Sequence, residues 1–267
     1  MRKPSPGIQA LSIAVVGLAL AVIPALAQTN SNDQEARHQI EKAKIFREAY
    51  PLISETDLYC AFYAHQGELP DLRIVAAEKG EEKILLSDND LCFINKGKND
   101  GLEIGQVFII IEIGQSLGEH GSLALKQGRG LIVFLEDNRS VVRIEKACGR
   151  VMVGDFLVPF EEKESLLGKD LGYEAFSGGE PGAVGTIIYL QGDYNQVGPG
   201  HWGIIDIGES SGVMVGQQMT IYNQVREDLP RMAIGNLVVI DTGPTTATVK
   251  ILSASDSIHK GLQVKAK

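Results

Sequence analysis

One pentapeptide has the residue types and the spacing of a catalytic nucleophile. Residues 208–212 read Gly-Glu-Ser-Ser-Gly and match G-x-S-x-G, in which a serine on a tight strand-to-helix turn attacks an acyl group. Residues 97–101 read Gly-Lys-Asn-Asp-Gly and repeat the two glycines without the serine. A strand rather than a helix is expected after the motif. A serine hydrolase that uses Ser210 is therefore the least favoured function, and the glycines indicate a structural corner.

Other residue types that bind metals or phosphates are scattered along the chain. The five histidines lie singly, and no Cys or His pair has the short spacing of zinc ligands. The segments 88–90 and 99–101 are rich in Asp and Asn but do not continue as a calcium-binding loop. The phosphate-binding patterns G-x-x-x-x-G-K-[ST] and G-x-G-x-x-G are absent. We therefore predict a protein that is not an enzyme and has no catalytic residue, cofactor or metal.

Aromatic residues offer a binding chemistry instead. Tyr189, Tyr194 and Trp202 lie close together in the sequence. Exposed aromatic rings pack well against sugar rings, although core packing is the more common role of such side chains. These three residues are the candidate ligand face of an alternative function, a module that binds peptidoglycan or another glycan.

The chain contains an internal copy of a glycine-bounded hexapeptide. Residues 101–106 read Gly-Leu-Glu-Ile-Gly-Gln, and residues 212–217 read Gly-Val-Met-Val-Gly-Gln. Glycine adopts positive φ without steric cost, so Gly101, Gly105, Gly212 and Gly216 are predicted to form sharp corners between strands. The two apolar residues inside each corner are expected to point to one side and to fill a core.

The repeat extends beyond the two corners. Gly130 aligns with Gly235 and Gly154 with Gly261, and the copies then differ in length only where loops are expected. A long polar loop is predicted over 114–129, and no sustained helical period appears between residues 57 and 160. The predicted strands are 57–64, 72–78, 91–95, 107–113, 130–136, 140–148 and 156–158 in the first half, and 185–190, 203–207, 219–222, 246–251 and 262–265 in the second.

Three cysteines leave one of them without a partner. Cys92 lies inside an apolar run, where a free thiol behaves as a small buried hydrophobe. We therefore favour a disulfide between Cys60 and Cys148, which would join the start of the first repeat to its end. Spacing alone leaves the other pairings open.

The beginning of the chain has the pattern of a secretory signal peptide. Arg2 and Lys3 precede an apolar run over 11–23, and residues 25–27 read Ala-Leu-Ala, as at a cleavage site. The run is shorter than the roughly 20 residues that span a bilayer. We predict cleavage after residue 27 and no integral membrane span afterwards, with an uncleaved anchor as the alternative.

The next segment is predicted to form one amphipathic α-helix over 33–49. Asn32 and Glu35 have the spacing of a capping box, Ala36 and Ile40 begin an apolar face, and Pro51 ends the pattern. The helix could dock on a partner, lie on the first domain or act as a spacer.

These patterns predict an all-β protein of two tandem small β-barrels, SH3-like or similar, preceded by one helix and a signal peptide. Closure into barrels would remove strand edges that invite aggregation. The predicted organisation is a signal peptide (1–27), an N-terminal helix and spacer (28–55), a first β-barrel (56–160), a linker (161–182) and a second β-barrel (183–267).

The charge balance excludes two classes of partner. The formal net charge is −9, and the predicted signal peptide contains positive charges only. Such an acidic chain repels phosphate backbones and anionic lipid surfaces. We therefore expect no nucleic acid partner, and we expect envelope proteins or peptidoglycan instead.

The residue pattern of the repeats resembles a known family. It consists of residues 90–97 (Asp-Leu-Cys-Phe-Ile-Asn-Lys-Gly), 101–105 (Gly-Leu-Glu-Ile-Gly), 129–130 (Arg-Gly) and 154–155 (Gly-Asp). This order resembles the C-terminal β-barrel domain of flagellar assembly protein T and related modules of secreted bacterial proteins that carry LysM domains. The resemblance implies a small barrel used for assembly or attachment in the cell envelope, without an active site. The leading expectation is a periplasmic or secreted bacterial protein that acts as a structural or protein-interaction module.

Overall fold

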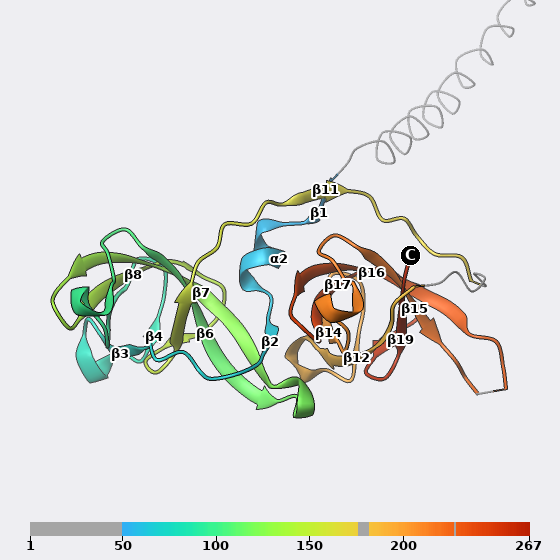
Figure 1. The fold of residues 1–267 in the computed structure, drawn as a ribbon, viewed down its shortest axis with the longest axis horizontal. Helices are drawn as coiled ribbons and strands as arrows, with labels where there is room; N and C mark the ends of the chain where they lie inside the picture. Colours follow the sequence, from blue (N-terminus) through green and yellow to red (C-terminus); the bar gives the residue numbers. More distant parts are fainter. Residues whose placement is uncertain (1–49, 176–181, 227) are drawn as a thin grey trace, which may run out of the picture. The chain divides into compact units, whose positions relative to one another are not determined.

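The computed structural model describes residues 50–175, 182–226 and 228–267, which belong to one compact unit (Figure 1). They form the predicted all-β fold, with two β-barrel modules and one short α-helix. The predicted signal peptide (1–27) and the predicted helix over 33–49 lie outside the described residues. Among the residues described, no helix is both long and apolar enough to cross a membrane.

The second module is a closed barrel of six antiparallel strands in the order β12-β14-β17-β16-β15-β19. Closure occurs where β12 pairs with β19. Side chains alternate between the inside and the outside of the barrel, and Ile221, Leu237 and Val249 lie in its buried core. The strands are β12 (Val184–Leu190), β14 (Trp202–Ile205), β15 (Gln218–Asn223), β16 (Met232–Thr242), β17 (Ala247–Ala254) and β19 (Gln263–Ala266), with a small accessory pair of β13 (Gln196–Val197) and β18 (Ile258–His259).

The first module repeats this strand order as β3-β5-β8-β7-β6-β10. Its end strands meet through a single bridge between Arg73 and Phe156, and Ile74 N donates a 2.9 Å hydrogen bond to Asp155 O beside that bridge. The strands are β3 (Ile74–Ala77), β5 (Leu91–Ile94), β6 (Val107–Ser116), β7 (Ser122–Leu135), β8 (Ser140–Ala147) and β10 (Phe156–Pro159), with an accessory pair of β4 (Leu85–Leu86) and β9 (Val151–Met152).

Short 3-10 helices occupy the turns of both modules. Two of them precede the glycine corners at equivalent places in the repeat. Within the described ranges they are η1 (Gly80–Glu82), η2 (Lys98–Asp100), η3 (Gly118–His120), η4 (Gln191–Asp193) and η5 (Glu209–Ser211).

The strand registers correct one part of the repeat alignment. Ile110 pairs with Gly128 as Ile221 pairs with Gly235, and the two isoleucines have the same offset as the corners. Gly128, not Gly130, is therefore the equivalent of Gly235. An added Cβ would lie 2.6 Å from a backbone oxygen at Gly128 and 2.8 Å from one at Gly235. A shift of two residues keeps the same strand face, so alternation alone could not reveal the error.

The four corner glycines all have positive φ: 82° at Gly101, 89° at Gly105, 76° at Gly212 and 87° at Gly216. Only the first apolar residue of each corner packs in a core. Leu102 and Val213 pack against the first and second core, respectively.

The second apolar residue of each corner corrects the expectation that both face inward. Ile104 is 66% exposed, and Val215 is also exposed. The reason is a tight turn, in which Gln106 N donates to Glu103 O at 3.3 Å, so this part of the corner is not an extended strand. The turn directs Ile104 outward.

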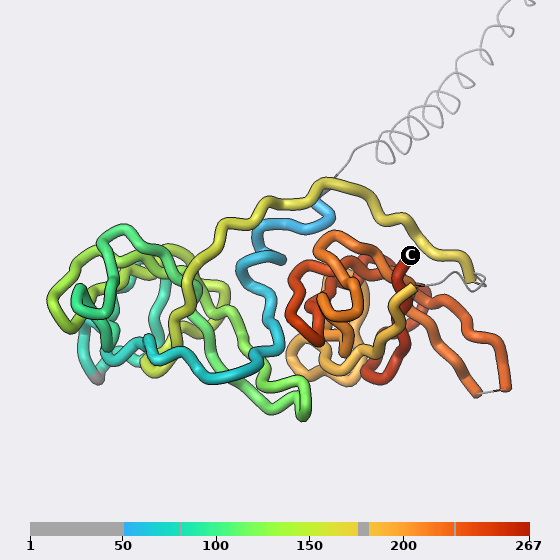
Figure 2. Tube along the Cα trace, in the orientation of Figure 1, coloured from blue at the N-terminus to red at the C-terminus, as the bar shows by residue number. Residues whose placement is uncertain are grey.

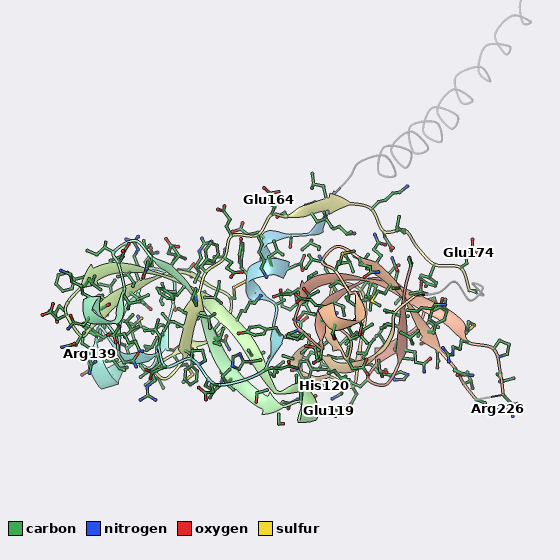
Figure 3. All side chains as sticks on the ribbon, viewed as in Figure 1. Glu119, His120, Arg139, Glu164, Glu174 and Arg226 are labelled. Atoms are coloured by element: carbon green, nitrogen blue, oxygen red, sulfur yellow. A yellow bond between two sulfur atoms is a disulfide. The ribbon has the colours of Figure 1, made fainter. Side chains whose placement is uncertain are left out.

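The predicted polar loop over 114–129 is instead a β-hairpin. β6 continues to Ser116, β7 begins at Ser122, and η3 forms the tip, where Glu119 and His120 lie (Figure 3). β2 (Tyr63–His65) pairs with the extended part of β7. Leu123 of this part of β7 is buried in a cluster with Phe62, Tyr189 and Ile204, which explains an apolar residue in a segment predicted to be a polar loop.

The predicted strand over 57–64 is also corrected, because it begins as α2 (Glu55–Cys60). The Ser54 side chain accepts a hydrogen bond from Asp57 N at 3.3 Å, and the Asp57 carboxylate accepts one from Ser54 N at 2.8 Å. This capping box fixes the first turn of the helix. A helix of this length is too short to give a sustained helical period.

The segment 161–182 contains a strand that its linker-like composition did not predict. β11 (Leu166–Gly168) pairs antiparallel with β1 (Tyr50–Ile53) (Figure 1). The chain on both sides of the first module is thereby joined by strand pairing.

Gly97 and Gly208, which precede the two corners, are expected to tolerate alanine poorly. An added Cβ would lie 2.4 Å from Glu136 O at Gly97 and 2.2 Å from Gly243 O at Gly208. We expect Gly97→Ala and Gly208→Ala each to lower the free energy of unfolding by about 2–3 kcal/mol, because the backbone must move. The measurement is urea unfolding. Gly101→Ala is the control: it meets open space and should cost only about 1 kcal/mol of φ strain. Equal losses at all three would contradict the close approach.

Candidate interaction surface

Ser210 does not occupy the place of an activated nucleophile. It lies in η5, and its Oγ donates a 2.7 Å hydrogen bond to the carbonyl oxygen of Pro244. Of the flanking glycines, Gly208 leaves room for the close backbone of Gly243, and Gly212 adopts a positive φ. Among the residues that the structure describes, no group of three His, Cys, Asp or Glu could hold a metal ion.

The three candidate aromatic residues do not share one exposed face, which corrects that expectation. Tyr189 is only 4% exposed, and its ring packs edge-on against Phe62 at a centroid distance of 5.0 Å. Trp202 is half-buried, and its Nε1 donates to Asp57 at 2.9 Å. Tyr194 alone is well exposed. Tyr189 and Trp202 are instead covered by another segment of the same chain.

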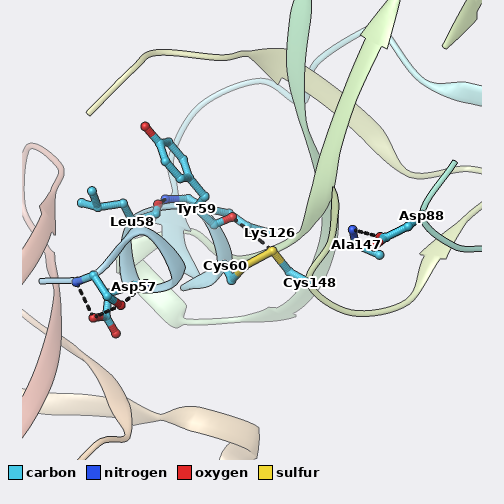
Figure 4. The surroundings of a disulfide bond; sticks show 9 residues. Asp57, Leu58, Tyr59, Cys60, Asp88, Lys126, Ala147 and Cys148 are labelled. Carbon is cyan, nitrogen blue, oxygen red and sulfur yellow. Dashed lines mark hydrogen bonds between the residues drawn. A yellow bond between two sulfur atoms is a disulfide. The ribbon is translucent and has the colours of Figure 1, made fainter. Parts of the chain in front are cut away.

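Cys60 and Cys148 are joined by a disulfide, the pairing favoured from the sequence (Figure 4). Cys60 ends α2, and Cys148 follows β8 directly, with a Cα–Cα distance of 5.4 Å. Cys92 is fully buried, and burial raises the pKa of its thiol to about 12. The bridge therefore fixes α2 to the first module.

The same α2 also packs against the second module. We call residues 50–65 the covering segment; it contains β1, α2 and β2 and is blue in Figure 2. Leu52, Ile53 and Leu58 from this segment form a buried cluster with Val238 and Ile240 of β16. One short segment thus contacts both modules, by a disulfide on one side and by apolar packing on the other.

A buried ion pair fixes the covering segment to the second barrel. The Asp57 carboxylate accepts hydrogen bonds from Lys250 Nζ at 2.7 Å and from Trp202 Nε1 at 2.9 Å. Burial raises the pKa of Asp57, but the bonds from Lys250, Ser54 and Trp202 outweigh it, so the pKa is lowered overall. The Thr248 hydroxyl adds a 2.8 Å hydrogen bond to Phe62 O.

A second charge cluster joins the first module and the linker to the second module. Asp241 of β16 accepts bonds from Lys126 Nζ of β7 at 3.0 Å and from Lys163 Nζ at 2.8 Å. Lys126 is almost buried, and burial lowers the pKa of its ammonium despite the attraction of Asp241. Lys126 also donates to Leu58 O at 2.9 Å, so its donors meet both the carboxylate and α2.

The residues beneath the covering segment form two rows across three strands. We call these rows the covered face. One row is Trp202–Lys250–Val238, and the other is Ile204–Thr248–Asp241.

The strand registers place two equivalent rows on the outside of the first barrel, which we call the open face. One row is Leu91–Arg143–Leu131, and the other is Phe93–Val141–Phe134. The phenylalanines are 39% and 53% exposed. Of its six side chains, only Arg143 is charged.

An apolar outer face is unusual for an antiparallel barrel that is bathed in water on its outside. Such strands normally alternate apolar residues inside with polar residues outside. On β5, Cys92 and Ile94 fill the core while Leu91 and Phe93 point outward. The sequence contains a signal of this face, since residues 91–94 are apolar at every position, but that run by itself predicts only a strand.

The corners provide a smaller set of exposed apolar residues. Ile104 lies at the first corner, and Met214 and Val215 lie at the second. We call these three residues the corner tips. They do not form a continuous row across neighbouring strands as the open face does.

These features define the class: a duplicated small-barrel protein with one outer face covered by its own chain and an equivalent face open. Comparison with known proteins gives no match, either to a protein-family model or to a curated protein sequence.

Proposed function

We propose that this is an exported, non-catalytic protein of the bacterial cell envelope that acts as a structural or protein-interaction module. The observation that carries the proposal is the open face, an exposed apolar surface on a disulfide-linked scaffold. Exposed apolar patches of this kind mark binding surfaces in soluble proteins. The equivalent face of the second module binds a polypeptide segment, which supports a protein rather than a small molecule as the partner.

Other features agree with an envelope address. The signal-peptide pattern of residues 1–27 directs export, and a disulfide forms and persists in an oxidising compartment. The resemblance of the repeats to the barrel domain of flagellar assembly protein T supports a role in assembly or attachment. The acidic composition argues against nucleic acid.

Two measurements on the producing bacterium test the proposal. Mass spectrometry of the isolated protein should find Gln28 as its first residue, in the periplasmic or secreted fraction. Crosslinking with a short amine-reactive reagent in intact cells should then join it to another envelope protein. A cytoplasmic protein with an intact N-terminus would contradict the proposal, as would turnover of a cell-wall substrate without any protein crosslink.

A further inference from the structure

We propose that the open face binds a helical segment of a partner polypeptide, one that presents apolar side chains on one side and a carboxylate to Arg143. This inference rests on the proposed function and names the class of partner. It concerns the six side chains defined above as the open face, which lie on β5, β8 and β7.

The open face and the covered face are equivalent in the fold. Each face consists of two cross-strand rows at the same registers of three equivalent strands. On the second module these rows lie under β1, α2 and Phe62, which directly precedes β2. The chain itself therefore contains one example of how this part of the barrel binds a polypeptide.

The open face is mainly apolar. Phe93 corresponds to Ile204, which is fully buried beneath the covering segment, whereas Phe93 is 39% exposed. Transfer of an exposed phenylalanine ring from water into an apolar contact is favourable. The open face thus has the chemistry of a contact surface without a cover among residues 50–175, 182–226 and 228–267.

Arg143 carries the single charge of the open face. Arg143 occupies the position at which Lys250 binds the Asp57 carboxylate. Within the described part of the chain, no acidic side chain pairs with Arg143, which is exposed. A guanidinium at the centre of an apolar contact binds a carboxylate well because it can donate two parallel hydrogen bonds. The partner is therefore expected to supply that carboxylate, as α2 does with Asp57.

The charges of the two faces favour a different polypeptide over a second copy of this chain. In a symmetric pair, two open faces would bring two Arg143 side chains together without a carboxylate. Phe134 also stands where the covered face has Asp241, so the open face offers no acid to a lysine of its partner. Both features favour a different polypeptide with an acidic and apolar helix.

The test is photo-crosslinking in the producing bacterium. The benzophenone amino acid p-benzoylphenylalanine replaces Phe93 or Phe134 in the full chain, and the same replacement at Met214, a corner tip, serves as the comparison. We expect adducts at Phe93 and Phe134 that mass spectrometry maps to a segment of another polypeptide with helical apolar spacing and at least one carboxylate. Adducts to a second copy or to a glycan, or no adduct, would overturn the inference.

Charge reversal gives the second readout. Arg143→Glu, an exposed change that should not disturb folding, is expected to lower the adduct yield at Phe93 about tenfold. Arg143→Lys should keep most of the yield. Replacing the mapped carboxylate of the partner by lysine should restore the adduct with Arg143→Glu. A yield unchanged by Arg143→Glu would overturn the assignment of the carboxylate and with it the inference.

The comparison site separates this inference from the proposed function. Protein adducts at Met214 with none at Phe93 or Phe134 would overturn the inference and leave an envelope interaction protein intact. No protein adduct at any of the three sites would contradict both.

Discussion

Removal of the Cys60–Cys148 disulfide is expected to lower the free energy of unfolding by about 4.5 kcal/mol. The two cysteines are separated by 88 positions, and in the chain-entropy model a closed loop of that length gives roughly this value. The bridge also fixes α2, so its loss should loosen the covering segment. The measurement is guanidinium unfolding of the Cys60→Ala/Cys148→Ala variant.

Cys92→Ala is the control for the disulfide variant. Cys92 is free and buried, and its replacement removes one sulfur from the core without opening the loop. A loss of about 1 kcal/mol is expected there. If the free energy of unfolding fell no further in the double variant than in this control, the disulfide would not be a main constraint on the chain.

Asp57→Ala is expected to be the most destabilising single substitution in the covering segment. It should lower the free energy of unfolding by about 3–5 kcal/mol. The change removes the only described ion-pair partner of Lys250, which is three-quarters buried, and leaves the Trp202 indole N–H without its acceptor. Breaking a buried pair from one side costs this much because the remaining charge is left uncompensated. It also removes half of the capping box with Ser54.

The matched control is Asp228→Ala. Asp228 forms a 3.0 Å ion pair with Arg226, but both groups face solvent, so no measurable loss of stability is expected. Thermal unfolding of the two variants beside the parent protein provides the comparison. Similar melting temperatures for Asp57→Ala and the parent would contradict the role of the buried pair.

The Asp57 pair also predicts a pH dependence. Its pKa in the folded protein lies below the ordinary value of 3.8 because the bonds from Lys250, Ser54 and Trp202 outweigh burial. Because the pKa is lowered in the folded protein, the Asp57 pair contributes fully to the free energy of unfolding above pH 3.8. That contribution is lost as the pH falls through the folded pKa. The difference in unfolding free energy between the parent and Asp57→Ala should therefore shrink in acid.

Much of the fold follows from local patterns that are visible in the sequence. The copied glycine corners revealed the duplication, because positive φ at Gly101 and Gly212 is a strict backbone requirement. The apolar alternation of residues 246–251 gave the correct strand there. The repeat also explained Gly208 without a catalytic serine.

The errors have a common physical origin, since they depend on contacts between distant segments. The extended β6–β7 hairpin was not predicted because β2 supplies part of its pairing and cover. The burial of Trp202 and Tyr189 depends on a segment more than a hundred residues away in the sequence, which packs over them. No local pattern contains that information.

The open face could have been suspected from the sequence but not located. Residues 91–94 are apolar on both faces, which is typical of a strand buried on two sides. Only the strand registers place Phe93, Val141 and Phe134 in one row. Only the second module shows what such a row binds.

The most direct test of the central claim is the accessibility of the open face in the cell. Phe134→Cys is labelled with a membrane-impermeant maleimide, both as purified protein and in cells whose outer permeability barrier has been opened, with Tyr194→Cys as an exposed control. Intact protein mass should verify first that Cys60 and Cys148 remain paired.

Both introduced cysteines should react rapidly in the purified protein. In cells, Tyr194→Cys should remain reactive, which reports export. The labelling rate of Phe134→Cys should be at least fivefold lower than in the purified protein, a ratio that corresponds to about 1 kcal/mol of binding free energy. Arg143→Glu should restore its reactivity. Equal labelling of Phe134→Cys in cells and in purified protein would contradict the claim that a partner covers this face.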